Sequence, residues 1–154
     1  MIFLGIDTSA QTASVAVCDE EKIIITASLN TGLTHSQTLL PMVESILSAS
    51  NMKLSDIDAF AVSNGPGSFT GIRIGVSAVK GFSYANNKPC AAVSTLEALA
   101  YNMQGFDGII CPVMDARRNQ VYNALFENGE RLCEDRAISI EELKAELEAY
   151  DKKI

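Results

Sequence analysis

The sequence predicts an α/β fold whose opening pattern of elements begins a second time before the chain ends. Strand-like segments alternate with helical ones in the order βββαβαβ, followed by another helix, and helices placed between strands indicate parallel pairing. The pattern then restarts: a turn lies 13 residues after Asp7, and another lies 13 residues after Asp115. We therefore expect an N-terminal lobe over 1–105 (βββαβαβα) and the start of a second lobe over 106–154 (βββα).

The first lobe is expected to begin with three strands and a helix. Apolar runs separated by turns predict strands over 1–6, 13–18 and 22–29. Apolar residues at helical spacing then predict a helix that begins near Thr38. Pro41 would fall within its first turn, where a missing N–H group costs nothing.

The apolar stripe of this helix covers roughly 160° of its circumference, which is wider than a single core-facing seam needs. Its members are Leu39, Leu40, Met42, Val43, Ile46 and Leu47. The helix is either buried on two sides within the fold, or buried on one side with the other offered to a partner, as large apolar surfaces often are. We favour the partner interpretation.

A second helix is expected over 72–85, after a short strand over 59–62 and the glycine-rich stretch SNGPGSFTGIRIG (63–75). One face of this helix is apolar, and a second, polar stripe runs beside it. The apolar face consists of Ile72, Val76, Val79 and Phe82. The polar stripe consists of Arg73, Ser77, Lys80 and Tyr84.

Two further helices have clear start signals. A strand over 91–93 and a helix over 96–103, capped by Ser94 or Thr95, complete the first lobe. In the second lobe, Ser139 and Glu142 form a capping box that starts the last predicted helix.

The glycine-rich stretch resembles a phosphate-binding loop without matching one. A Walker A loop needs a Lys-Ser/Thr pair that is missing here, and a dinucleotide fingerprint needs G-x-G-x-x-G, in which Gly71 comes one place late. One interpretation is a strand-to-helix turn in which Gly71 and Gly75 let the helix approach another backbone closely. The other is contact with a phosphate or nucleotide through Gly65, Gly67 and Ser68 at the helix N-terminus.

Two aspartates at expected strand ends extend the nucleotide hypothesis. Asp7, followed by Thr8 and Ser9, and Asp115 occupy corresponding places in the two proposed copies. In a duplicated α/β fold such turns face a ligand cleft, where paired aspartates could hold a hydrated Mg²⁺ with a nucleotide. Alternatively, each aspartate caps its own turn through its side chain. The sequence leaves both interpretations open.

Charge and residue usage exclude several classes of function. A net charge of −7 argues against independent binding of nucleic acid. No apolar run is long enough to span a membrane and no signal peptide precedes the first strand, so we expect a cytoplasmic protein. The four cysteines lack C-x-x-C spacing, which indicates buried free thiols.

His35 is the single histidine of the chain. One histidine excludes an H-x-x-x-H or H-E-x-x-H metal site within this chain. No G-x-S-x-G motif supplies the serine of a catalytic triad. We therefore expect a structural role for His35, no catalytic residue and no metal ligand.

Four motifs, in the same order along the chain, resemble those of the TsaB (YeaZ) family. They are GIDTS (5–9), HSQTLLP (35–41), GPGSFTGIRIG (65–75) and DARRNQVY (115–122). These bacterial proteins belong to the pathway that makes threonylcarbamoyladenosine in tRNA. The resemblance implies the actin-like, Hsp70-like and sugar-kinase-like (ASKHA) fold, a duplicated ribonuclease H-like architecture. Family members run considerably further, so the resemblance also implies a second lobe that is incomplete in this chain.

The resemblance further implies a non-catalytic role and a set of partners. TsaB proteins pair with their paralogue TsaD, which transfers threonylcarbamoyl from its adenylate to N6 of the adenosine next to the tRNA anticodon. The P-loop protein TsaE joins this complex, and TsaB forms a homodimer when TsaD is absent. Pairing through the first helices of the family corresponds here to the apolar stripe within 39–47 and to the helix 72–85. The resemblance implies only indirect contact with tRNA and no cofactor held by this chain alone, with ATP and Mg²⁺ left open for the complex.

Two other functions fit parts of the sequence. An ATPase or small-molecule kinase of the same fold would use Asp7, the loop 65–71 and Asp115. A glycoprotease-type peptidase follows only from an older name of the superfamily, and the sequence offers no nucleophile–base pair for it.

Overall fold

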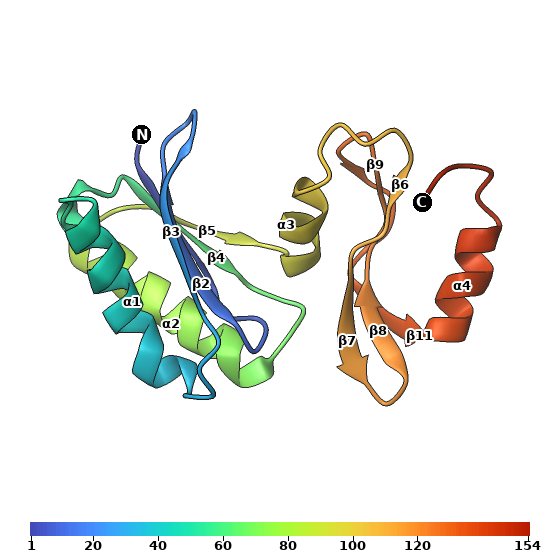
Figure 1. Cartoon of the computed structure of the whole chain (residues 1–154), viewed down its shortest axis with the longest axis horizontal. Coiled ribbons are helices and arrows are strands. Elements are labelled where there is room, and N and C mark those ends of the chain that lie inside the picture. Colours follow the sequence, from blue (N-terminus) through green and yellow to red (C-terminus); the bar gives the residue numbers. More distant parts are fainter. The chain divides into compact units, whose positions relative to one another are not determined.

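The structure, a computed structural model, describes all 154 residues and divides them into two compact units. Unit 1 spans Met1–Val93 and unit 2 spans Ser94–Ile154 (Figure 1). Each unit has its own cluster of buried apolar side chains. The division falls before the helix that follows the fifth strand, whereas the sequence places the boundary after that helix, at 105/106. No helix in the chain combines the length and apolarity needed to cross a lipid bilayer.

Unit 1 is a five-stranded mixed sheet with two long helices packed on it. Its elements are β1 (Phe3–Asp7), β2 (Ala13–Cys18), β3 (Ile23–Leu29), α1 (His35–Ala49), the 3-10 turn η1 (Leu54–Asp56), β4 (Ala59–Ser63), α2 (Phe69–Asn86) and β5 (Cys90–Val93). The strand order is β3-β2-β1-β4-β5. The first three strands form an antiparallel meander, while β4 pairs parallel to both β1 and β5. The parallel pairs confirm the prediction made from the alternation of strands and helices.

The core of unit 1 lies between the sheet and these two helices. In the register of β1 and β2, Leu4 pairs with Val17 and Ile6 pairs with Val15, and all four side chains are buried. α1 packs on β2 and β3, and α2 packs on β1 and β4 and against α1 (Figure 1). Alternate burial along these strands is the pattern of a sheet with one covered face.

α1 begins at His35 rather than near Thr38, so Pro41 lies inside the helix and not in its first turn. The side-chain oxygen Oε1 of Gln37 accepts a hydrogen bond from the N–H of Thr34 at 3.3 Å, which supports the earlier start. Proline has no N–H group, so the carbonyl of Gln37 lacks its usual helical partner. Packing of α1 on the sheet offsets this loss, because tertiary contacts supply most of the stability of such helices.

α2 also begins before its expected start, at Phe69 rather than Ile72. The hydroxyl of Ser68 caps the helix by accepting a hydrogen bond from the N–H of Gly71 at 3.2 Å. Phe69 is therefore the first helical residue and not part of the preceding loop.

Unit 2 repeats the three-stranded meander of unit 1 in the same spatial order. Its elements are α3 (Thr95–Tyr101), β6 (Ile109–Ile110), β7 (Val113–Arg117), β8 (Gln120–Asn123), β9 (Phe126–Glu127), β10 (Glu130–Arg131), β11 (Arg136–Ser139) and α4 (Ile140–Glu148). Each strand of the meander is divided in two, and the halves form two antiparallel sheets with the orders β10-β9-β6 and β11-β8-β7. Both orders place the third, second and first strands side by side, as in β3-β2-β1. Unit 2 thus has a three-stranded meander followed by a helix, in the order expected for 106–154, and the Ser139–Glu142 capping box begins α4.

Asp115 lies inside β7 and does not end a strand, contrary to the sequence-based expectation. β7 continues to Arg117, and a tight turn then leads directly into β8. The three residues Arg117, Arg118 and Asn119 have φ angles of 65°, 51° and 62°. A two-residue hairpin turn of type I′ requires this left-handed conformation at both of its central residues. The motif DARRNQ therefore forms the tip of a hairpin.

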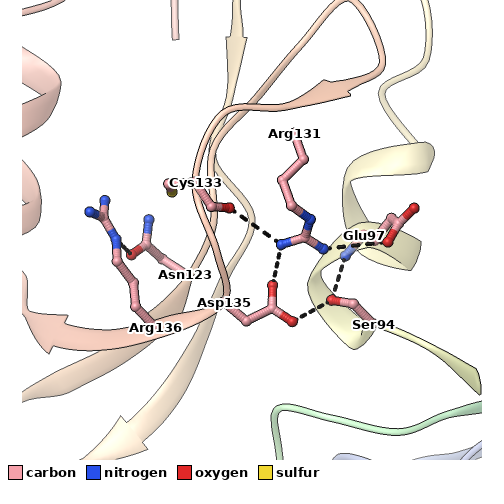
Figure 2. A network of polar contacts seen from close by, with 7 residues as sticks. All are labelled: Ser94, Glu97, Asn123, Arg131, Cys133, Asp135 and Arg136. Atoms are coloured by element: carbon pink, nitrogen blue, oxygen red, sulfur yellow. Dashed lines mark hydrogen bonds and ion pairs between the residues drawn. The ribbon is translucent and has the colours of Figure 1, made fainter.

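Polar contacts hold α3 to the strands of unit 2 (Figure 2). The guanidinium of Arg131 forms ion pairs with Asp135 and with Glu97 of α3, and it lies 4.8 Å from the centre of the Phe126 ring. Asp135 also accepts a hydrogen bond from the hydroxyl of Ser94 at 2.7 Å. The apolar side of α3 joins a buried cluster that consists of Leu96, Ala100, Ala124 and Phe126. These contacts explain why α3 belongs to unit 2 and why the division falls before it.

Candidate partner-binding surface

The glycine-rich stretch forms an elbow between β4 and α2 that lies against the loop after β1. The N–H of Ser68 donates to the carbonyl of Ser9 at 2.6 Å, and the hydroxyl of Thr8 donates to the carbonyl of Gly71 at 2.8 Å. A Cβ atom on Gly71 would overlap the backbone carbonyl oxygen of Thr8, and one on Gly75 would overlap the Thr8 hydroxyl. The predicted close approach is confirmed, and the neighbouring segment belongs to the same chain.

The N–H groups at the start of α2 are partly engaged within the chain. A helix N-terminus binds an anion through N–H groups that lack partners. Here the N–H of Ser68 donates to Ser9, and the N–H of Gly71 donates to the hydroxyl of Ser68. This geometry favours the strand-to-helix turn. Phosphate contact through Gly65, Gly67 and Ser68 stays a prediction.

Both candidate aspartates cap their own turns. A side-chain oxygen of Asp7 accepts from the N–H of Ser9 at 2.8 Å, and one of Asp115 accepts from the N–H of Arg117 at 2.7 Å. The same bond from residue i to residue i+2 occurs at both places, as the turn-capping alternative predicts. Thr8 and Ser9 are buried beside Asp7. A role of these residues toward Mg²⁺ or a nucleotide stays a prediction.

His35 connects the start of α1 to the same loop. Its Nε2 atom lies 2.8 Å from the carbonyl oxygen of Ala10, to which it donates in the tautomer that carries the proton on Nε2. The ring also borders Gly71 at the start of α2. The contacts of His35 are therefore those of a structural residue. The chain has no group of three or more His, Cys, Asp and Glu side chains placed so that it could hold a metal ion.

The four cysteines are free thiols, but the expectation that all are buried is wrong. Cys90 is exposed because it lies on β5, at the edge of the sheet, and Cys18, Cys111 and Cys133 are partly buried. Burial raises the pKa of the Cys111 thiol.

Five of the six stripe residues on α1 belong to the core of unit 1. They are between 1% and 7% exposed, and they are Leu39, Met42, Val43, Ile46 and Leu47. Leu40 is 50% exposed. The sheet covers one part of the wide arc and α2 covers another, so the stripe as a whole does not present a side to a partner. This corrects the expected contact surface on α1, of which Leu40 remains accessible.

The polar stripe predicted on α2 is exposed along its whole length. Arg73, Ser77, Lys80 and Tyr84 are all exposed, Tyr84 to 92%. Phe69 extends the stripe by one turn and is 73% exposed, and the guanidinium carbon of Arg73 lies 5.3 Å from the centre of its ring. Successive spacings of 4, 4, 3 and 4 residues place all five on one face of the helix.

A groove of about 550 Å³ lies beside this stripe, between α1 and α2. Leu40 lines it from α1, and Phe69, Arg73 and Ser77 line it from α2. Aromatic side chains and arginine beside accessible apolar groups are the composition of protein-binding sites. The α1–α2 surface is defined here by the exposed residues Leu40, Phe69, Arg73, Ser77, Lys80 and Tyr84.

Phe69 is the member of this surface that lies outside the residues predicted from sequence. The sequence-based helix starts at Ile72, which leaves Phe69 in the loop. Two signals point to it nonetheless: Ser68 is a preferred N-cap residue, and Phe69 lies four residues before Arg73.

Comparison with known proteins finds relatives whose names assign them to tRNA modification. Residues 30–150 match the family model of TsaD, described as tRNA N6-adenosine threonylcarbamoyltransferase. The chain is 40% identical to the tRNA threonylcarbamoyladenosine biosynthesis protein TsaB of Bacillus subtilis, with coverage of 87% of this chain and 58% of that protein. It is 36% identical to TsaB of Escherichia coli, with coverage of 84% and 57%. The chain thus spans somewhat more than half the length of these relatives.

Solved structures agree with this relationship. YeaZ from Pseudomonas aeruginosa superimposes with a TM-score of 0.78 at 34% identity, over 89% of this chain and 67% of that one. The ethanolamine utilization protein EutJ from Carboxydothermus hydrogenoformans shares the fold alone, with a TM-score of 0.55 at 15% identity over 96% of this chain and 56% of that one. The fold is the actin-like, duplicated α/β fold that the sequence predicts.

Proposed function

Because the chain belongs to the TsaB (YeaZ) family, we propose that it serves the biosynthesis of threonylcarbamoyladenosine in tRNA as a binding partner of TsaD. In this role TsaD carries out the threonylcarbamoyl transfer, and this chain is a non-catalytic scaffold that acts in the cytoplasm. TsaE would join the assembled complex, tRNA would be contacted only through the partners, and the chain would pair with itself when TsaD is absent.

The α1–α2 surface carries this proposal. It presents a half-exposed leucine, two highly exposed aromatic rings and an arginine on one side of unit 1, and a groove lies next to them. Burying such side chains is favourable at about 25 cal/mol per Å² of apolar surface. Aromatic residues and arginine are also the residue types that dominate the energy of protein interfaces.

The side chains that could do chemistry support the non-catalytic part of the proposal. Asp7 and Asp115 each accept a backbone hydrogen bond that stabilises their own turn. His35 contacts the carbonyl of Ala10. These contacts give each group a structural task and do not pair a base with a nucleophile.

Two exposed tyrosines allow a matched test of the surface. Tyr84 is 92% exposed on α2, and Tyr101 is 70% exposed on α3 in unit 2. We expect Tyr84→Ala to weaken association with purified TsaD by about thirtyfold if Tyr84 contributes about 2 kcal/mol as an interface anchor. Tyr101→Ala should leave the dissociation constant unchanged. Isothermal titration calorimetry measures both, and the absence of any association between the wild-type chain and TsaD would contradict the proposal.

Nucleotide binding is the alternative, through Asp7, the loop 65–71 and Asp115. Calorimetry with ATP and Mg²⁺ tests it directly on this chain and on its complex with TsaD. Saturable binding that is lost in Asp7→Asn would favour an ATPase or kinase of this fold over a scaffold.

A further inference from the structure

The helices α1 and α2 together carry a net charge of opposite sign to that of the whole chain. The chain has 19 acidic and 12 basic residues, yet α2 contains no acidic residue. Arg73 and Lys80 of α2 are exposed, and neither forms an ion pair within the chain. The one acidic residue of α1 is Glu44, and α1 has no Lys or Arg. Two cations and one anion give these helices a net charge of +1 in a chain of net charge −7.

We infer that the α1–α2 surface binds an acidic surface of a partner protein and that its charge favours such a partner over a second copy of this chain. The inference rests on the proposed function, which assigns the surface to partner binding. Opposite charges across an interface accelerate association, and like charges facing each other suppress the wrong partner. Two copies paired through α1 and α2 would bring together four cations and two anions, whereas an acidic partner would neutralise the surface.

The geometry of Arg73 suits recognition of a carboxylate. Its guanidinium lies 5.3 Å from the centre of the Phe69 ring, so the aromatic ring restricts the side chain before a partner arrives. A planar guanidinium binds a carboxylate through two parallel hydrogen bonds, and a side chain that is already ordered loses less entropy on binding. Lys80 lies seven residues further along the same face, which corresponds to about 10 Å along the helix axis. The partner should therefore present two carboxylates at about this separation.

The composition of the surface favours a protein over RNA. RNA and DNA affinity comes largely from many phosphate contacts, and this surface offers two cations. Besides Ser77, its remaining exposed members are the apolar or aromatic side chains of Leu40, Phe69 and Tyr84, next to a groove of about 550 Å³. A partner that fills the groove with apolar side chains and surrounds them with carboxylates matches both features.

The different salt dependences expected for TsaD binding and for self-association test the inference. The association of this chain with TsaD and its self-association are measured by analytical ultracentrifugation from about 0.05 M to about 0.5 M NaCl, a range over which exposed charges become screened. We expect salt to weaken the TsaD complex and to strengthen, or leave unchanged, self-association. Arg73→Gln combined with Lys80→Gln should weaken TsaD binding between about twofold and thirtyfold, which corresponds to two exposed ion pairs. Glu44→Gln should act in the opposite direction.

Lys22→Gln is the matched control, because Lys22 is exposed beside the turn between β2 and β3 and not on the helices. Its single-site counterpart on the surface is Lys80→Gln. If Lys22→Gln weakens TsaD binding as much as Lys80→Gln does, net charge and not the α1–α2 surface is responsible, and the inference is overturned. An unchanged affinity for TsaD in the double variant also overturns it, while leaving the proposed function intact. Binding of purified tRNA that competes with TsaD and is lost in the double variant would assign the surface to RNA instead. Failure of the wild-type chain to bind TsaD at every salt concentration would refute the proposed function itself.

Discussion

Leu39 and Leu40 are adjacent on α1 but lie in opposite environments, and replacing each by alanine separates folding from binding. Leu39 is 1% exposed and belongs to the core of unit 1, so Leu39→Ala should cost about 2–5 kcal/mol, the usual loss for a buried leucine. Leu40 is 50% exposed. Full burial of a leucine side chain contributes about 1.5–3 kcal/mol, and half of that range is about 0.75–1.5 kcal/mol, so Leu40→Ala should cost about 1.5 kcal/mol at most. Alanine's higher helix propensity reduces that cost further.

Guanidinium unfolding at 25 °C, followed by far-UV circular dichroism, measures the stability difference, because α1 and α2 are the two longest helices. The TsaD titration then supplies the second measurement. We expect Leu40→Ala to remain folded and bind TsaD more weakly, and Leu39→Ala to lose stability. Equal losses of stability in the two variants, or a loss below about 1 kcal/mol for Leu39→Ala, would refute the burial argument.

Three further outcomes follow from individual contacts. Gly71→Ala should destabilise the chain by about 1–3 kcal/mol, because its Cβ would overlap the carbonyl of Thr8. Gly81→Ala, in the same helix with open space around it, should stabilise the chain by about 0.5–1 kcal/mol. Thermal unfolding of both variants gives the sign of each stability change, and the same sign for both would contradict the close approach. Cys90 should react with iodoacetamide well before Cys111, because Cys90 is exposed whereas burial raises the pKa of the Cys111 thiol. Peptide mass spectrometry reports the order of labelling, and faster labelling of Cys111 would contradict this burial. Hydrogen bonds from the N–H and hydroxyl of Ser139 lower the pKa of Glu142 below its ordinary 4.5. The contribution of Glu142 to stability should therefore be complete above pH 4.5 and be lost as the pH falls through the lowered pKa. The midpoints of urea unfolding across this pH range should depend less on pH in Glu142→Gln, and an unchanged dependence would contradict the capping role.

Periodic patterns explain why the fold could be predicted from sequence while the candidate site could be predicted only in part. The order of strands and helices, the parallel pairing of β4 and the close approach at Gly71 depend on local spacing and on the special backbone of glycine. The place of Asp115 depends on how far β7 continues, and this is set by the hairpin tip from Arg117 to Asn119. Arg and Asn at such a tip are a weaker turn signal than Asn-Gly, so the spacing from Asp7 suggests a strand end that the chain does not have.

The wide apolar arc of α1 shows why an amphipathic pattern does not by itself identify a binding surface. The width of such an arc states how much of a helix must be covered, but not which element covers it. When two helices lie side by side on one sheet, each has two neighbours, and α1 uses both, because it packs on β2 and β3 and against α2. An arc of roughly 160° is then what two internal contacts require.

α2 has the same two kinds of neighbour, but its buried residues are only Gly71, Gly75 and Val79. Because two of these are glycines, α2 approaches the loop and sheet beneath it closely with little side-chain bulk, and the stripe from Phe69 to Tyr84 stays exposed. The helix with the weaker apolar stripe is therefore the one with more surface to offer a partner.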